Sequence, residues 1–320
     1  MKPVCSIVIR AFNEERYLGR LLEGISQQTI QDVQVILVDS GSIDKTVKIA
    51  KERKADIVSI DPQDFTFGRS LNMGIEAAKS DFILIVSAHV YPVYPDWIEK
   101  MLEPFSDSSI ALVYGKQRGV SDSQFSERQI FNHWYPDVSQ NPQDHPFCNN
   151  ANAAIRRSLW KKNPYNESLS GLEDLAWAKW AQENNYKIAY IAQAEIKHVH
   201  EESWRGIKKR YLREGMAFKS IYPQENFTIL DLIRLFVKNT SSDFYQAKRE
   251  HVFMQEFIGI LRFRWQQFHG TYLGYRRSGP LTWQLKQSFY YPRNNNSHTV
   301  RYSQRDVHPI DYQKNSDTIE

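Results

Sequence analysis

The chain has 320 residues, of which 41% are hydrophobic, and its formal net charge at pH 7 is +4. This length and composition allow a sizeable buried core and exclude a predominantly disordered chain. The two cysteines, Cys5 and Cys148, lie far apart and in no metal-ligand spacing, which excludes a disulfide scaffold and a zinc ribbon.

The first ninety residues alternate between apolar runs and segments with helical spacing. Strands are predicted at 4–9, 33–38, 57–60 and 82–86. Helices are predicted at 15–27, at 70–79 and, with Asp44 suited to cap its start, around 47–50. The pattern predicts an α/β fold with a mostly parallel sheet covered on both faces. In such sheets ligands bind at the carboxyl ends of the strands, so the loops at 11–14, 39–42 and 87–89 should converge on one crevice.

The first apolar run, at 4–9, also bears on the location of the protein. It is too short for the core of a signal peptide and too short to span a membrane. We therefore expect a cytoplasmic protein.

The second half is less regular. A strand is predicted at 110–115, a polar loop with aromatic residues at 119–148, a helix at 173–184, a strand at 188–191 and a basic helix at 204–218. Residues 1–222 would form the main domain, 223–293 a helical extension and 294–320 a polar, disordered tail. The extension has apolar faces at 229–236 and 253–268, which fit either a helical hairpin packed on the core or a segment that docks on the inner face of the membrane.

Positive charge is concentrated towards the end of the chain. Residues 197–320 contain 20 Lys and Arg against 12 Asp and Glu, a balance of +8 that leaves −4 for residues 1–196. This bias suits a phosphate-bearing ligand or an anionic membrane surface, although solvated surface charge is an alternative. No nucleic-acid partner is expected, because no known nucleic-acid module accompanies the charge.

The segments Ser6–Glu15 and Ile36–Asp44 resemble the paired nucleotide-binding signature of family 2 glycosyltransferases. The resemblance runs over roughly residues 4–218 and implies the GT-A nucleotide-diphospho-sugar transferase fold. It also implies inverting transfer of a sugar from a nucleotide-sugar donor to a hydroxyl of a glycan or lipid-linked acceptor, in polysaccharide biosynthesis. The base and ribose would be held by Ala11, Phe12, Glu14 and Asp39. A turn-forming role is the alternative for Asp39.

The segment at 67–74 resembles the family's glycine, basic, asparagine and glycine motif. The resemblance places Gly68, Arg69 and Asn72 near the nucleotide, where a guanidinium group can neutralise phosphate. A plain surface charge is the alternative for Arg69.

Residues 87–89 occupy the place of the family's Asp-X-Asp metal motif, but Ser87, Ala88 and His89 stand there. Ser87 and Ala88 are still expected beside the nucleotide. Because Mg²⁺ prefers hard oxygen ligands, two hypotheses remain open for a divalent metal. Either His89 and His200 hold a metal such as Mn²⁺, or His89, Arg69 and the basic helix neutralise the leaving phosphate without one. His89 as an ordinary cleft residue is the third alternative.

The segment at 147–157 resembles the strand that lines the donor sugar in this family. Asn150 and Asn152 are therefore predicted to bond sugar hydroxyls, since an amide side chain both donates and accepts hydrogen bonds. The preceding loop is expected to shape the acceptor side. There Trp134 would stack on a sugar ring or fill the core.

The segment at 170–178 matches the family's Glu-Asp pair at the start of a helix, here Glu173 and Asp174. Direct displacement at the anomeric carbon requires a base for the acceptor hydroxyl, and Asp174 is the predicted base. One base without an enzymic nucleophile implies inversion. The alternative is that both carboxylates only stabilise the helix N-terminus.

On the basic helix, Arg210 and Arg213 share one face and would bind phosphate or a lipid-diphosphate acceptor. Two other functions are alternatives. A non-catalytic module that binds sugar nucleotides or glycans would retain the fold without the chemistry. A nucleotidyltransferase would need a glycine-rich basic signature near the N-terminus, which the sequence lacks.

Overall fold

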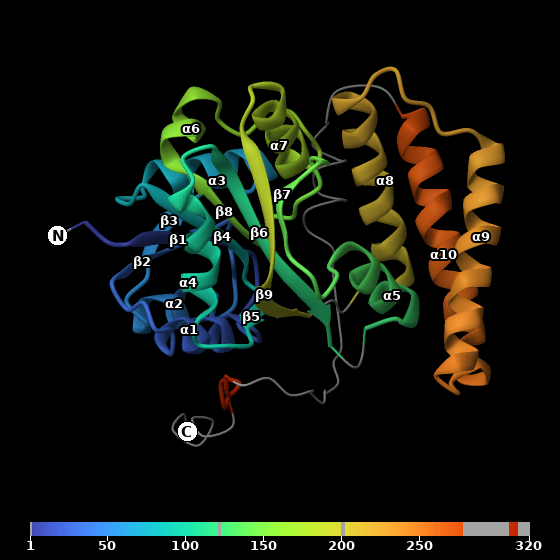
Figure 1. Ribbon diagram of the computed structural model, residues 1–320, viewed down its shortest axis with the longest axis horizontal. Helices are drawn as coiled ribbons and strands as arrows, with labels where there is room; N and C mark the ends of the chain where they lie inside the picture. The colour runs from blue at the N-terminus through green and yellow to red at the C-terminus, as the bar shows by residue number, and fades with distance from the viewer. Residues whose placement is uncertain (1, 121–122, 200–201, 278–306, 313–320) are drawn as a thin grey trace.

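The computed structural model describes residues 2–120, 123–199, 202–277 and 307–312 (Figure 1). Within them lies one nine-stranded sheet in the order β3-β2-β1-β4-β8-β6-β9-β5, with β7 paired to β9. The strands are β1 Cys5–Ala11, β2 Val33–Asp39, β3 Asp56–Ser59, β4 Phe82–Ser87, β5 Val90–Pro92, β6 Ile110–Gly119, β7 Gln140–Gln143, β8 Asn152–Arg156 and β9 Lys187–His198.

The sheet is mixed. Strands β3, β2, β1 and β4 are mutually parallel, as predicted, and β6 is parallel to β9. Strand β8 runs antiparallel to both β4 and β6 and so joins the two parallel groups. The α/β class expected from the alternating pattern is confirmed.

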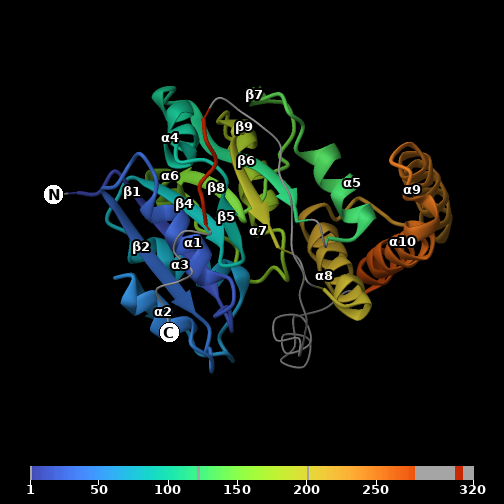
Figure 2. The same ribbon diagram turned by 90° about the horizontal axis from the view of Figure 1, so that it is seen from below.

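Helices cover both faces of the sheet (Figures 1 and 2). On one face lie α1 Leu18–Ser26, α2 Thr46–Glu52 and α4 Trp97–Leu102, followed by the 3-10 turn Glu103–Ser106. On the other lie α3 Phe67–Glu76, α6 Arg157–Lys162 and α7 Glu173–Glu183. Helix α1 buries Leu18, Leu21, Leu22 and Ile25, the spacing that gives a helix one apolar stripe.

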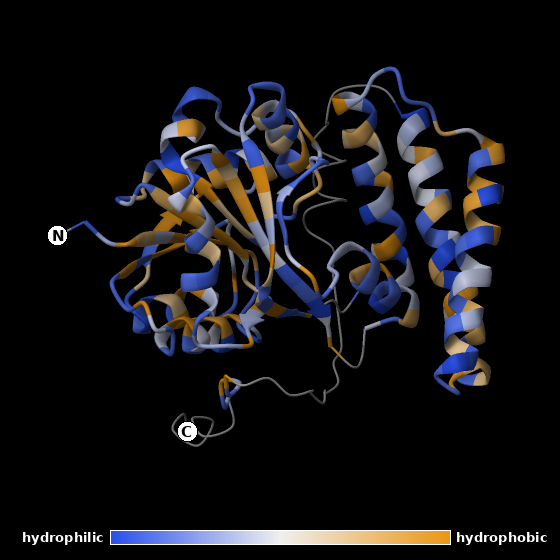
Figure 3. Cartoon of the chain, viewed as in Figure 1, coloured by the Kyte–Doolittle hydropathy of each residue, from blue (hydrophilic) through white to orange (hydrophobic). Residues whose placement is uncertain are grey.

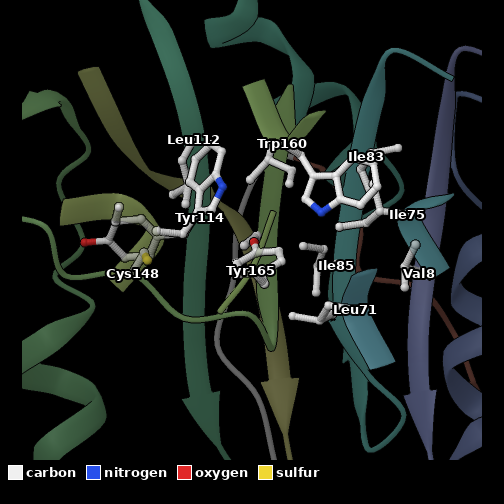
Figure 4. Close-up of a cluster of buried hydrophobic side chains, with 14 of the residues drawn as sticks. Val8, Leu71, Ile75, Ile83, Ile85, Leu112, Tyr114, Cys148, Trp160 and Tyr165 are labelled. Atoms are coloured by element: carbon white, nitrogen blue, oxygen red, sulfur yellow. The ribbon is translucent and has the colours of Figure 1, made fainter. Parts of the chain in front are cut away.

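The core on the second face is rich in aromatic side chains. Figure 4 shows Trp160, Tyr165 and Tyr114 among aliphatic residues of α3 and the central strands. These side chains fill the space between the sheet and the helices that carry the candidate site.

The prediction of a loop at 119–148 is wrong in part. It contains helix α5 Phe125–Trp134 and the short strand β7. The helical signal is weak because polar residues take core-facing positions: Ser126 and Glu127 are buried and bonded to Asp243 and Arg210.

Three long helices stand beside the sheet: α8 Trp204–Ile221, α9 Ile229–Arg249 and α10 Phe253–Arg276, with α10 between the other two (Figure 1). Helices α8 and α10 approach closely at glycines, since a Cβ on Gly270 would meet the Lys208 carbonyl oxygen at 2.6 Å. The region forms a helical hairpin packed on α8 and α5, and docking of this hairpin on a membrane stays a prediction. Among the described residues, no helix combines the length and the apolar character that crossing a membrane requires.

Residues 307–312 lie against the end of strand β5. The Ile310 amide donates to the Val93 carbonyl at 3.0 Å, and the Tyr312 hydroxyl donates to the Pro92 carbonyl at 2.5 Å. The predicted disorder of 294–320 is therefore wrong for these six residues, which gain backbone bonds and a ring contact with Tyr91. The rest of that tail lies outside the described residues.

Candidate active site

The predicted loops meet at one edge of the sheet. In the parallel register Ala11 lies beside Asp39, and Arg10 lies between Val38 and Ser87. The carboxyl ends of β1, β2 and β4 therefore open side by side, as the alternating pattern predicted.

The first two loops are bonded to each other. The Glu14 amide donates to Thr46 Oγ1 at 2.7 Å, and the Ile43 amide donates to Asn13 Oδ1 at 2.9 Å. The buried Asp39 carboxylate accepts the amide hydrogens of Gly41 and Ser42. This is the turn-forming role of Asp39, whereas its contact with a nucleobase stays a prediction.

Two histidines stack at the end of β4. Nδ1 of His89 lies 2.8 Å from Glu14 Oε1, and the His89 ring stacks on His198 with centroids 5.2 Å apart. His198 Nδ1 in turn lies 2.8 Å from Gln117 Oε1. Burial lowers the pKa of His89, but the charge and hydrogen bond of Glu14 outweigh burial, so the pKa is raised overall.

Of the two predicted metal ligands, His89 lies within the described residues. In the part of the chain that the structure describes, no three His, Cys, Asp or Glu side chains are grouped to hold a metal ion. His200, the second predicted ligand, lies outside the described residues, and Nδ1 of His89 faces Glu14. The described residues do not fit a metal site by themselves.

The two carboxylates at the start of α7 are both buried. Leu172, just before them, has φ 54°, a left-handed conformation that is costly for leucine and turns the chain into the helix. Asp174 accepts the Asn150 amide hydrogen on Oδ2 at 3.0 Å and the Leu175 amide hydrogen on Oδ1 at 2.8 Å. Asp174 is 7% exposed and Glu173 5% exposed.

The environment of Asp174 disfavours its charged form. Burial and then the neighbouring charge of Glu173 raise the pKa of Asp174 to about 7, against the opposing effect of the Asn150 and Leu175 amides and of Arg10. A carboxyl group with this pKa can take up and release a proton near neutral pH.

Arg10 and Phe67 complete the site and were not singled out from the sequence. Arg10 Nη1 lies 3.1 Å from Glu173 Oε1. The guanidinium carbons of Arg10 and of Arg213 each lie 4.7 Å from the centroid of the Phe67 ring. An arginine within the otherwise apolar strand at 4–11 was the available signal, because a charged residue there needs a buried partner.

Residues 6–163 match the model of glycosyl transferase family 2. This segment, about half of the chain, belongs to the family. O-antigen chain rhamnosyltransferase RfbN of Salmonella typhimurium is 29% identical over 223 residues, which are 66% of this chain and 71% of the relative. O-antigen chain rhamnosyltransferase WbaN of Salmonella anatum is 29% identical over 201 residues, 59% of this chain and 64% of the relative, so slightly less than two thirds of that protein is matched.

Two solved structures share the fold. The mannosyltransferase PcManGT from Pyrobaculum calidifontis, in complex with GDP-Man and Mn²⁺, aligns with a TM-score of 0.57 and 12% identity over 91% of this chain and 88% of that chain. S. aureus TarS 1-349 aligns with a TM-score of 0.50 and 13% identity, over 83% and 90%. The GT-A fold implied by the sequence motifs is thereby confirmed.

Several residues that the family motifs single out have internal partners in this glycosyltransferase. Asn72 donates to the Tyr165 carbonyl and to Glu167, and its oxygen accepts from Trp160 and from the Tyr165 amide. Asn152 donates to the Lys116 and Ala194 carbonyls and accepts from Trp97. Both asparagines have their amide hydrogens occupied, so the structure gives them a packing role and their contacts with a ligand stay predictions.

The glycine and the arginines of the motifs also have protein contacts. A Cβ on Gly68 would meet the Asn166 carbonyl oxygen at 2.6 Å, so Gly68 lets α3 approach that loop. Arg210 donates to Glu202 and Glu127 at 2.8 and 2.7 Å, which ties α8 to α5. Arg69 is half-exposed, and its nearest carboxylate, Asp64, is 3.9 Å away. Its contact with a phosphate stays a prediction.

Asn150 and Trp134 are the residues predicted to contact a sugar that have not yet been placed. The Asn150 side chain lies 3.4 Å from both Glu173 and the Tyr165 hydroxyl. Trp134 is 42% exposed and stacks on Phe147 with centroids 4.4 Å apart. Phe147 is partly buried and lies three residues before Asn150, whose amide bonds Asp174, so one short segment links the Trp134 contact to the buried carboxylate.

Proposed function

We propose that this family 2 enzyme is an inverting glycosyltransferase. In this proposal it transfers a sugar from a nucleotide-sugar donor to a hydroxyl of a glycan or lipid-linked acceptor during the assembly of a cell-surface polysaccharide. The similarity to two O-antigen chain rhamnosyltransferases makes nucleotide-activated rhamnose the first donor to test. The observation that carries the proposal is the buried Asp174, held by two amide hydrogens and with its pKa raised to about 7.

In the proposed reaction Asp174 is the general base. Each of its oxygens accepts one amide hydrogen and keeps a lone pair for the acceptor hydroxyl. The hydroxyl oxygen attacks the anomeric carbon while its proton passes to Asp174, and the bond to the nucleotide phosphate breaks on the opposite face. A single displacement of this kind inverts the configuration at that carbon.

The departing phosphate needs positive charge on its side of the crevice. Arg10 is paired with Glu173, Arg213 lies over the same Phe67 ring as Arg10, and Arg69 is half-exposed at the start of α3. We propose that these arginines and His89 face the donor phosphates, because fixed cations stabilise charge that develops on a leaving group.

A module that only binds sugar nucleotides is the rival function. Such a module has no use for a buried carboxylate with a raised pKa, because desolvating that group lowers stability without aiding binding. The presence of Asp174 in this state therefore favours the enzyme.

The experiment is a transfer assay with nucleotide-activated rhamnose and a membrane extract as acceptor source. Asp174→Asn keeps the size of the side chain but removes the base, so the rate should fall by about 100-fold to 10000-fold with a small change in donor affinity. Glu183→Gln, at the exposed far end of the same helix, is the matched control and should keep full activity. An Asp174→Asn protein that transfers sugar at the parent rate, or a product with retained configuration, would contradict the mechanism.

A further inference from the structure

The outer surface of the α9–α10 hairpin carries apolar side chains that the fold does not bury. Leu230, Ile233 and Val237 on α9 are 74%, 53% and 56% exposed. Their spacing of three and four residues puts them on one stripe of the helix. On α10, Ile258 is 62% exposed and Trp265 46% exposed. Figure 3 shows hydrophobic colour along α9, the helix farthest from the sheet.

The exposed charged residues within the two helices are all of one sign. Every residue of α9 and α10 is described, and none of their exposed residues is acidic. The exposed charged residues are Arg234, Lys238, Lys248, Arg249, Arg262 and Arg276. The chain as a whole has nearly equal numbers of acidic and basic residues, 37 and 41, so this surface departs from its average composition.

The acidic residues within the two helices are used for internal contacts, and one further acid, Glu250, is exposed in the turn between the helices. Asp231 closes the capping box with Thr228 at the start of α9. Asp243 is buried and accepts two hydrogen bonds from Arg264. Glu256 lies 3.7 Å from Arg128 of α5. Asp243 and Glu256 therefore face the protein and Asp231 is held in the capping box, so the exposed cations leave the outer surface positive. One of these cations, Arg262, also lies 4.9 Å from the centroid of the Trp204 ring of α8.

A hollow of about 400 Å³ opens at one end of this surface. It lies where α9 begins and α10 ends and is lined by Asn226, Phe227, Thr228, Ile229, Tyr272, Tyr275 and Arg276. Ile229 and Arg276 belong both to the hollow and to the exposed surface. Tyrosine rings with a nearby arginine are typical of the boundary between lipid tails and headgroups.

We propose that the outer face of α9 and α10 docks on an anionic lipid bilayer. Isolated apolar side chains on a surface need no partner, but an apolar stripe accompanied by six exposed cations matches the pattern of helices that lie in a membrane interface. The apolar residues enter the boundary of the acyl chains, and the arginines and lysines bind the lipid phosphates. A second copy of the chain is a poorer partner, because pairing this face with itself would bring two sets of six cations together.

The test is co-sedimentation of the full chain with vesicles. This measurement needs neither donor nor acceptor, so its outcome does not depend on whether the proposed function is correct. One vesicle is phosphatidylcholine alone, and the other is an equal mixture of phosphatidylcholine and phosphatidylglycerol. Binding is expected to the mixed vesicle and to weaken with added NaCl, because salt screens the phosphate contacts.

Two variants separate the apolar and charged contributions. Arg234→Glu with Lys238→Glu should lower the affinity for the mixed vesicle by about tenfold or more. Ile233→Asp with Val237→Asp should also abolish sedimentation. The matched control is Lys51→Glu with Lys79→Glu, which makes the same change of net charge at two exposed lysines of the N-terminal half and should bind like the parent.

Circular dichroism and thermal unfolding establish that each variant is folded. Equal sedimentation with both vesicles, or an equal loss of binding in the control variant, would overturn the proposal. So would a folded parent protein that does not sediment but forms a dimer which Ile233→Asp with Val237→Asp dissociates, since a second copy would then be the partner of this face.

Discussion

Arg10, the penultimate residue of strand β1, forms an ion pair with Glu173 at the start of helix α7, with 3.1 Å between Nη1 and Oε1. The two residues are 163 positions apart in the sequence. Their contact links the strand edge that should hold the nucleotide to the carboxylate pair that should act on the acceptor. The charge of Arg10 also lowers the pKa of Asp174 and opposes the effect of Glu173.

Replacing Arg10 should therefore change the pH dependence of transfer. In Arg10→Met the pKa of Asp174 rises above its parent value of about 7, so a smaller fraction of the base is ionised at a given pH. The acidic limb of kcat/KM should move to higher pH, with a loss of about threefold to tenfold near pH 6.5 and partial recovery near pH 8.5.

Arg10→Lys keeps the charge and should retain most of the parent profile. Arg53→Met, which removes an arginine from the opposite helical layer, should leave the profile unchanged. A uniform loss of rate in Arg10→Met without movement of the limb would mean that Arg10 only supports the fold.

The raised pKa of Asp174 also predicts how the stability of the protein depends on pH. Asp174 has a higher pKa in the folded protein than its ordinary value of 3.8, so folding favours its protonated form. Its contribution to stability is complete below about pH 4 and is lost as pH rises through about 7. Asn cannot ionise, so Asp174→Asn should gain stability over the parent between about pH 5 and pH 8, by roughly 2–4 kcal/mol.

Urea unfolding of the parent and of Asp174→Asn, each at about pH 5 and at about pH 8, gives this difference in stability directly. Glu183→Gln removes an exposed carboxylate from the same helix and should show no comparable gain. A difference in stability between Asp174→Asn and the parent that is the same at both pH values would exclude a raised pKa for Asp174.

The strands and the ligand-binding edge could be predicted from the sequence because their causes are local. Continuous apolar runs end at Ala11, Asp39 and Ser87, and parallel strands bring such ends together. The position of Asp174 at the start of a helix followed from its motif. In each case a residue and its near neighbours decide the structure.

The remaining features depend on partners that are distant in the sequence. Helix α5 has Ser126 bonded to Asp243, 117 residues away, and Glu127 bonded to Arg210, 83 residues away. Asn152 belongs to a motif that suggested a sugar contact, yet its oxygen accepts from Trp97 and its amide bonds the β9 backbone. A motif indicates which residue type a position requires, but tertiary contacts decide whether that side chain faces a ligand or the core.

The buried pair of Asp243 and Arg264 should be essential for attaching α9 and α10 to α5. Arg264 is 4% exposed and Asp243 2% exposed, and Asp243 also accepts the Ser126 hydroxyl. Arg264→Met leaves a buried carboxylate without its cation and should lower the free energy of unfolding by about 3–5 kcal/mol. Adding Asp243→Leu removes that carboxylate and should restore most of the loss, as measured by urea unfolding. A double variant no more stable than Arg264→Met would show that packing, and not the unpaired charge, dominates.

The hypothesis that His89 and His200 hold Mn²⁺ makes a prediction of its own. A ligand that binds only the folded protein raises its melting temperature, so Mn²⁺ should raise the melting temperature further in the presence of a bound nucleotide sugar. His89→Ala and His200→Ala should each remove the additional increase from Mn²⁺ while keeping the increase from the donor. His133→Ala, an unrelated histidine of α5, is the control.

Thermal-shift measurements with UDP-, GDP-, dTDP- and CMP-sugars also identify the base that the enzyme prefers. If Mn²⁺ changes the melting temperature with none of these donors, neutralisation of the leaving phosphate falls to Arg10, Arg69 and Arg213, and their replacement by Met should then weaken donor binding in proportion to the charge removed.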